Sequence, residues 1–145
     1  NARTITGKGQ RVVVRRMDSM IAATENTALK YIETGNIPAP MGNRYAAVSP
    51  YDSFTCKGGK VIIAAGTQQL YEKLCNEVLE RPDMLTDPRF VDMPGRLANQ
   101  DAIAEVIEER IKDLTPNEAA ELVLAHGIPA GPIMNIKEIL DDPHV

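Results

Sequence analysis

The stretch YDSFTCKGGKVIIAA, residues 51–65, decides the fold of this chain. Residues 51–56 and 60–65 favour strands and flank Lys57-Gly58-Gly59, where glycines supply the positive φ that tight hairpin turns require. Residues 61–65 are apolar throughout, which predicts a second strand buried on both faces. The sequence therefore predicts a β-hairpin.

Helical signals follow the hairpin. Gly66-Thr67 opens a predicted helix that ends before Pro82. After an irregular segment, another predicted helix covers residues 95–113. Residues 115–118 read Thr-Pro-Asn-Glu, a capping box with proline at the first helical position, and Gly127 ends the helix that follows.

The last predicted helix follows the short segment Ile133-Met134. Asn135 caps it, with Glu138 three residues further on. Its apolar residues are expected to face inward; they are Ile136, Ile139 and Leu140. Together, the hairpin and these helices indicate an α+β fold, a small and mostly helical domain.

The segment before the hairpin has a different character. Residues 10–16, QRVVVRR, predict a strand, and Asp18 is the predicted N-cap of a helix of about four turns that ends at Gly35. One strand and one helix cannot bury both faces of the strand. Residues 1–35 are therefore expected to be a strand–helix lead-in from a larger sheet that this chain lacks. This predicts self-association through the strand, or a poorly ordered lead-in.

The remaining boundaries follow from composition. Residues 36–50 contain Pro38, Pro40, Gly42 and Pro50 without an apolar period, which predicts a linker or an ordered loop. Residues 51–145 then form the small α+β domain. With 145 residues, 43% of them hydrophobic, the chain suits one domain with a short additional segment.

Charge and cysteine usage exclude several classes of protein. The net charge of -4 argues against a nucleic-acid partner, and no apolar run approaches the roughly 18–20 residues that span a bilayer. Cys56 and Cys75 have neither metal-ligand spacing nor a histidine nearby, which predicts buried free thiols and no metal site. The cytoplasm is the expected compartment.

No catalytic constellation stands out. His126 lies where a helix is predicted to end, so we interpret it as a capping residue rather than a catalytic one. Two other places are candidates for binding a substrate. The loop that contains Asn43, Arg44 and Tyr45 brings together an amide, a guanidinium and a phenol, which can hold a carboxylate or phosphate. The alternative is an ordered linker whose arginine makes a surface ion pair.

Gly66-Thr67 is the second candidate. It follows a predicted buried strand and opens a helix, so its backbone amides can bind an anion. A plain N-cap explains the same residues.

Several short motifs, taken in order, resemble family III CoA-transferases, the relatives of formyl-CoA and carnitine-CoA transferases. They run along nearly the whole chain: TGKGQ at 6–10, GNR at 42–44, SPYDSF at 49–54, GKVIIAAG at 59–66, RPD at 81–83, DPRF at 87–90, RLAN at 96–99, GIPAGPI at 127–133 and EILDDPHV at 138–145.

The resemblance implies a fold and an activity. A family member has a large Rossmann-like domain and a smaller α+β domain, and two subunits interlock as a homodimer. A large-domain aspartate attacks an acyl-CoA, so that coenzyme A passes to a second carboxylic acid through aspartyl intermediates. That aspartate precedes the TGKGQ segment, so we expect no catalytic residue in this chain and predict that the chain alone is inactive. Coenzyme A is a substrate here, and no tightly bound cofactor is expected.

The resemblance also places the loop of residues 41–49 over the active site. Two alternatives remain. One is an α-methylacyl-CoA racemase-like enzyme, whose relatives carry Glu-Pro just after the second hairpin strand, where this chain has Gly66-Thr67-Gln68-Gln69. The other is a free-standing helical interaction module.

Overall fold

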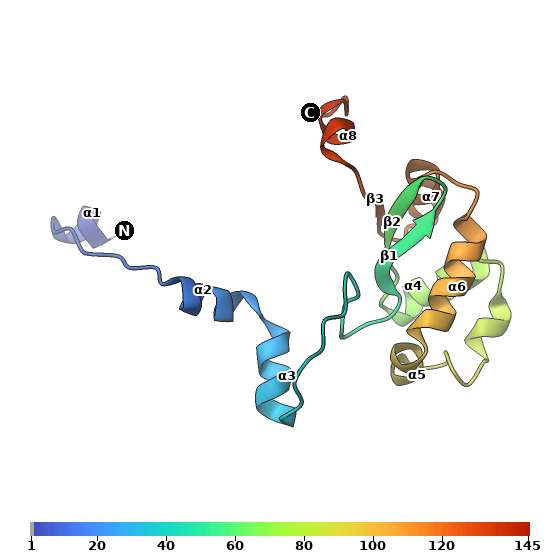
Figure 1. Ribbon diagram of the computed structural model, residues 1–145, viewed down its shortest axis with the longest axis horizontal. Helices are drawn as coiled ribbons and strands as arrows, with labels where there is room; N and C mark the ends of the chain where they lie inside the picture. The colour runs from blue at the N-terminus through green and yellow to red at the C-terminus, as the bar shows by residue number, and fades with distance from the viewer. Residues whose placement is uncertain (1) are drawn as a thin grey trace. The chain divides into compact units, whose positions relative to one another are not determined.

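The computed structural model describes residues 2–145, so Asn1, the first residue of the predicted lead-in, lies outside the described residues. The chain divides into two compact units, Asn1–Pro40 and Met41–Val145. The second unit has the predicted α+β fold, with a three-stranded antiparallel sheet (Figure 1).

The first unit contains three helices, α1 (Ala2–Thr6), α2 (Arg16–Ala23) and α3 (Asn26–Thr34). The predicted strand at residues 10–16 is wrong, because residues 8–15 have no regular secondary structure and α2 begins at Arg16. A lone strand leaves its backbone N–H and C=O groups without a ladder partner.

The prediction of one continuous four-turn helix is also wrong, because two helices, α2 and α3, form there. Its path breaks between α2 and α3, where Glu25 has a φ of 43°. Its predicted end at Gly35 is confirmed, since Gly35 adopts the left-handed conformation. None of the three helices buries a residue. The large apolar side chains of α2 and α3, such as Met17 and Ile32, are exposed.

The sheet of the second unit has the order β1-β2-β3, with both neighbouring pairs antiparallel. β1 (Tyr51–Cys56) and β2 (Gly59–Ala64) are the predicted hairpin, and Gly58 in its turn has a φ of 79°. β3 (Ala130–Pro132) pairs with the other side of β2, so that Ile62 lies opposite Gly131. The hairpin prediction is confirmed, and the sheet has one strand more than predicted.

β2 is not buried on both faces, and that prediction is wrong. Val61 and Ile63 are buried, whereas Ile62 between them is 41% exposed. Successive residues of a strand point to opposite faces of the sheet. Among the described residues, helices cover only the face on which Val61 and Ile63 lie.

Helices complete the second unit. They are α4 (Gln68–Lys73), the π-helical turn η1 (Leu74–Val78), the 3-10 helix η2 (Pro82–Leu85), α5 (Met93–Ala98), α6 (Gln100–Ile111), α7 (Pro116–Ala125) and α8 (Ile136–Leu140). The single helix predicted for residues 95–113 is two helices. Their path breaks at Asn99, whose side-chain amide donates to the carbonyl oxygen of Gly95 at 2.8 Å.

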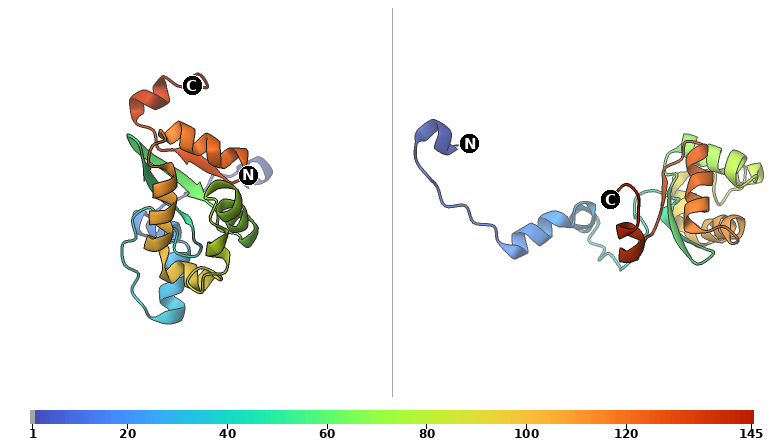
Figure 2. Two further views of the ribbon diagram at one scale, coloured as in Figure 1. Left: turned by 90° about the vertical axis from the view of Figure 1, so that its right-hand side faces the viewer. Right: turned by 90° about the horizontal axis from the view of Figure 1, so that it is seen from above.

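The core lies between the sheet and these helices. α6 runs beside β1, and α7 lies against β2 and β3 (Figures 1 and 2). The backbone N–H of Thr55 in β1 donates to Glu108 Oε1 of α6 at 2.7 Å. This contact occupies a donor on the outer edge of β1, which would otherwise be free to pair with another strand.

α8 does not contribute to this core. The prediction that its apolar residues face inward is wrong, because Ile136 is 73% exposed and Leu140 is 68% exposed. The capping prediction for the same helix is confirmed. The Asn135 side chain accepts from the Glu138 N–H, and Glu138 accepts from the Asn135 N–H.

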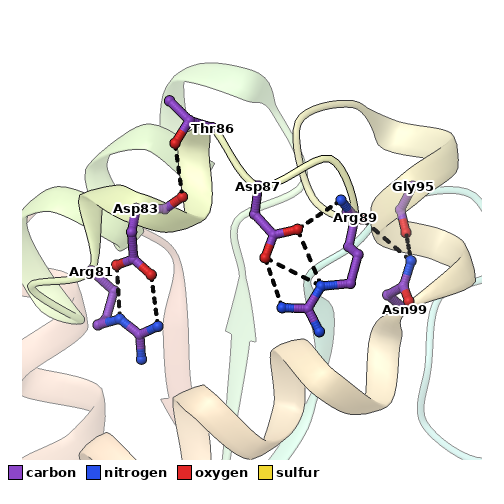
Figure 3. Close-up of polar contacts among 7 residues, drawn as sticks. All are labelled: Arg81, Asp83, Thr86, Asp87, Arg89, Gly95 and Asn99. Atoms are coloured by element: carbon purple, nitrogen blue, oxygen red, sulfur yellow. Dashed lines mark hydrogen bonds and ion pairs between the residues drawn. The ribbon is translucent and has the colours of Figure 1, made fainter.

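Two arginine–aspartate pairs shape the segment between η1 and α5. Arg81 binds Asp83 and Arg89 binds Asp87, each through two guanidinium nitrogens (Figure 3). The pKa values of both carboxyl groups lie below their usual range, mainly because the side chains of their arginines donate to them. The motifs RPD and DPRF thus have local contacts that explain them without a ligand.

The capping box of α7 is confirmed and predicts a pH effect. Hydrogen bonds from the Thr115 N–H and hydroxyl lower the pKa of Glu118. Because the pKa of Glu118 is lower in the folded state than in the unfolded state, these hydrogen bonds stabilise the fold above the unfolded pKa. This stabilisation is lost as the pH falls through the folded pKa. NMR titration of the Glu118 carboxyl carbon should give a pKa below the ordinary glutamate value. Thr115→Ala should raise it, and an unchanged pKa in this variant would contradict the assignment.

Candidate functional site

The loop with the three predicted site residues runs antiparallel beside β1. Asn43 Nδ2 donates to Ser53 Oγ at 3.1 Å, and Arg44 Nε donates to Asp52 Oδ2 at 2.9 Å. The Tyr45 N–H donates to the Tyr51 carbonyl at 3.0 Å, and the two rings lie 5.4 Å apart.

These pairings separate the three side chains. Ser53 and Tyr51 point to one face of the sheet and Asp52 to the other, because side chains alternate along a strand. Asn43 and Tyr45 therefore accompany the outer face, while Arg44 turns toward α6. The loop holds all three residues in place, but only Arg44 reaches the charged groups on that side.

Arg44 lies between two carboxylates. Besides Asp52, its Nη2 donates to Asp101 Oδ1 at 2.5 Å. The hydrogen bond to Asp101, and to a smaller extent the one to Asp52, raises the pKa of Arg44, so the guanidinium stays charged. Asp52 is fixed from its other side, where Oδ1 accepts the Ser53 N–H at 2.6 Å. A permanently charged, partly exposed guanidinium with a fixed orientation is suited to binding a carboxylate or phosphate.

Sequence reasoning missed both partners of Arg44. Asp52 could have been noticed as a carboxylate inside a predicted strand. Asp101 gave no signal, because it lies 57 residues from Arg44 in the chain.

Gly66 lies against Val48, near the end of the same loop, and Thr67 follows it at the start of α4. A Cβ on Gly66 would lie 2.7 Å from Val48 Cγ2, so glycine permits Val48 to pack here. The Thr67 hydroxyl accepts the Leu70 N–H at 3.2 Å, which makes it the N-cap of α4. Gly66 thus has a packing contact and Thr67 a capping contact.

Substitution of Gly66 tests this packing. Gly66→Ala should destabilise the second unit by about 1–3 kcal/mol, because the stiff Val48 side chain must move and the loop must move with it. Gly131→Ala is the matched control, since a Cβ there meets nothing within 4 Å. Equal unfolding midpoints for the two variants in urea would contradict the close contact.

A buried arginine lies deeper in the same unit. Arg96 is 2% exposed, and its guanidinium carbon lies 4.3 Å from the centre of the Tyr71 ring. Its Nη1 donates to the Phe90 carbonyl and to Gln68 Oε1, both at 3.1 Å. Through Gln68, Arg96 ties α5 to the first turn of α4. We interpret it as a structural residue of the core.

The two cysteines and His126 have structural surroundings that explain them without a catalytic role. Cys56 and Cys75 are buried free thiols, as predicted, and burial raises the pKa of both. His126 is the C-cap residue of α7, and its Nδ1 lies 3.1 Å from Glu77 Oε2. Residues 2–145 contain no group of three or more His, Cys, Asp or Glu side chains placed to hold a metal. None of the helices in this range has the length and apolar character needed to cross a membrane.

Comparison with solved structures defines the class of this fold. A CAIB/BAIF family protein from Brucella suis superimposes with a TM-score of 0.73 at 31% identity, covering 99% of this chain and 38% of that protein. Over residues 1–145 the sequence matches CoA-transferase family III. The chain belongs to CoA-transferase family III, which confirms the resemblance found in its motifs.

Two curated relatives are named as CoA-transferases. The acetyl-CoA:oxalate CoA-transferase of Acetobacter aceti is 31% identical over 142 residues, which are 98% of this chain and 36% of the relative. The succinyl-CoA:mesaconate CoA-transferase of Haloarcula hispanica is 36% identical over 140 residues, 97% of this chain and 34% of the relative. The chain thus spans about a third of the length of the relatives it matches.

Proposed function

We propose that this chain is the smaller domain, with a lead-in, of an enzyme that transfers coenzyme A between carboxylic acids. The family match over all 145 residues carries this proposal. The names of both curated relatives above state a CoA donor and an acid. The exposed apolar stripe of α2 and α3 supports a lead-in that packs on the Rossmann-like domain outside this chain.

The reaction centres on an aspartate outside this chain. Its carboxylate attacks the thioester carbonyl of the donor and forms a mixed anhydride, while the CoA thiolate leaves. The thiolate then attacks the aspartyl carbonyl and releases the donor acid, giving aspartyl-CoA. The acceptor carboxylate attacks that thioester, which forms a second mixed anhydride and expels the CoA thiolate. The thiolate finally attacks the acceptor's acyl carbon in this anhydride, which gives the acceptor's CoA thioester and restores the aspartate. No metal or bound cofactor is required, because the thioester supplies the activated acyl group.

The contribution of this chain is to bind the acid. Arg44 is the charged group of the loop, and we assign it to a substrate carboxylate, with Asn43 and Tyr45 holding the loop along β1. Val48 packs against Gly66, and Thr67 caps the helix that begins beside it. In this assignment, the fixed contact to Asp52 orients the guanidinium before the substrate arrives.

The racemase-like alternative differs in its chemistry at one point. A racemase moves a proton at the carbon beside the thioester and needs an acid–base group there. Where racemase relatives carry Glu-Pro, this chain has no carboxylate within residues 66–69, Gly-Thr-Gln-Gln. This favours the transferase.

Product analysis of the full-length enzyme distinguishes the two. The enzyme should convert an acyl-CoA and an acid into a new thioester, with one donor acid released for each thioester formed. Exchange of α-hydrogen with deuterated water, without any new thioester, would support the racemase instead. The isolated chain should show neither activity, since the attacking aspartate lies elsewhere. We also expect the full-length enzyme to be cytoplasmic and to form a homodimer. Light scattering of the purified protein tests the dimer.

A further inference from the structure

The two carboxylates that hold Arg44 differ in how firmly they are fixed. The Asp52 side chain is 17% exposed and is held by the Ser53 N–H as well as by Arg44. The Asp101 side chain is 85% exposed, and its bond to Arg44 is the one side-chain contact that the structure shows for it within residues 2–145. Asp52 is therefore a fixed partner, whereas water competes with the contact to Asp101.

Arg44 has donors to spare. A guanidinium carries five N–H donors. One goes to Asp52 and one to Asp101, so three remain without a partner among residues 2–145. With Nε occupied by Asp52, the two Nη nitrogens form the remaining edge of the fork, which can bind a carboxylate through two hydrogen bonds. Asp101 makes a single bond to Nη2, one of the two nitrogens of that edge.

The names of the relatives indicate which substrate carboxylate Arg44 would bind. The acids named for them, oxalate and mesaconate, are dicarboxylic acids. One carboxylate of such an acid becomes the thioester, so the other keeps its charge throughout the reaction and needs a permanent cation.

We infer that Arg44 binds the non-reacting carboxylate of a dicarboxylic acid, which displaces Asp101 from the Nη edge. This inference rests on the proposed function and deepens it. In the empty site Asp101 balances the charge of Arg44, and Asp52 keeps the guanidinium oriented during the exchange. Asp101 thus competes with the substrate for Arg44, and its removal strengthens binding.

The test uses the full-length enzyme with glutarate and with glutaramate, in which an amide replaces one carboxylate. Wild type should use glutarate at least tenfold more efficiently. Asp101→Asn should lower the KM for glutarate several-fold, leave kcat within twofold, and change the KM for glutaramate much less. Asp113→Asn, the same change just after α6, should alter neither. Asp101→Glu, which keeps a competing carboxylate, should stay close to wild type.

The outcomes separate this inference from the proposed function. A wild-type enzyme that transfers no coenzyme A to any acid refutes both. An enzyme that transfers coenzyme A but treats glutarate and glutaramate alike refutes the inference alone. So does a higher KM for glutarate in Asp101→Asn, because Asp101 would then help to hold the acid. A thermal midpoint of Asp101→Asn near that of wild type shows that a change in KM does not reflect unfolding.

Discussion

Replacing Arg44 by glutamine in the full-length enzyme should lower kcat/KM for the acid substrate by about 10- to 150-fold. Hydrogen bonds to charged groups contribute roughly 1.5–3 kcal/mol, and each 1.4 kcal/mol corresponds to a factor of ten. Glutamine keeps a polar side chain of moderate length but lacks the charge and the fork. The loss should appear in the KM of the acid, while the KM of the acyl-CoA donor should change little. Steady-state kinetics with each substrate varied in turn measures both.

Two further variants make this result specific. Arg44→Lys keeps the charge but not the planar fork, so it should fall between wild type and Arg44→Gln. Arg89→Gln removes another arginine that is paired with an aspartate, in the turn before α5 (Figure 3). It should leave the kinetics unchanged. Equal losses for Arg44→Gln and Arg89→Gln would show that the effect comes from general destabilisation.

The largest expected effect on stability comes from α6. Ile107 is fully buried in the core. Ile107→Ala should lower the free energy of unfolding by about 2–5 kcal/mol, because it removes buried methyl groups and leaves a cavity. Since each kcal/mol shifts the midpoint of a small domain by several degrees, the thermal transition should fall by roughly 10 °C or more. Urea unfolding of the 145-residue chain, followed by circular dichroism, measures the loss.

Ile136→Ala is the matched control, because it makes the same chemical change at a side chain that is 73% exposed. Its effect should stay within about 0.5 kcal/mol, the usual range for surface substitutions. A loss at Ile136 as large as that at Ile107 would mean that α8 packs against the domain and that the exposed position of Ile136 is wrong.

The sequence predicted the features that depend on local chemistry. The hairpin turn has its glycine at positive φ, and both capping boxes form as expected, at Thr115 and at Asn135. These motifs satisfy their own backbone groups within a few residues, so they need no distant partner.

The errors occurred where a distant or absent partner decides the structure. β3 has a three-residue sequence, Ala-Gly-Pro, without strand-forming character, and it becomes a strand because the free edge of β2 is available. The reverse holds for residues 10–16, which have strand-forming character but no partner strand within the described residues 2–145. Ile62 is exposed because the described helices cover only one face of the sheet. Such outcomes depend on tertiary packing rather than on local preference.

The candidate site shows the same division. The loop could be selected because its residue types suit an anion and no apolar period explains them. The geometry of the loop could not be predicted from the sequence, because Asp101 reaches Arg44 only when α6 is packed beside β1. The alternation along β1 then separates Arg44 from Asn43 and Tyr45, which a list of residue types does not reveal.

A crystal structure of the full-length enzyme with a CoA thioester and a dicarboxylic acid bound would show directly whether Arg44 binds the acid. We expect one carboxylate of the acid at about 3 Å from the Nη nitrogens of Arg44, the usual distance of a charge-assisted hydrogen bond. Asp101 should have moved away, Asp52 should still bind Nε, and an aspartate from outside residues 1–145 should lie against the thioester carbonyl. An acid bound elsewhere, with Arg44 still held by both aspartates, would contradict the account.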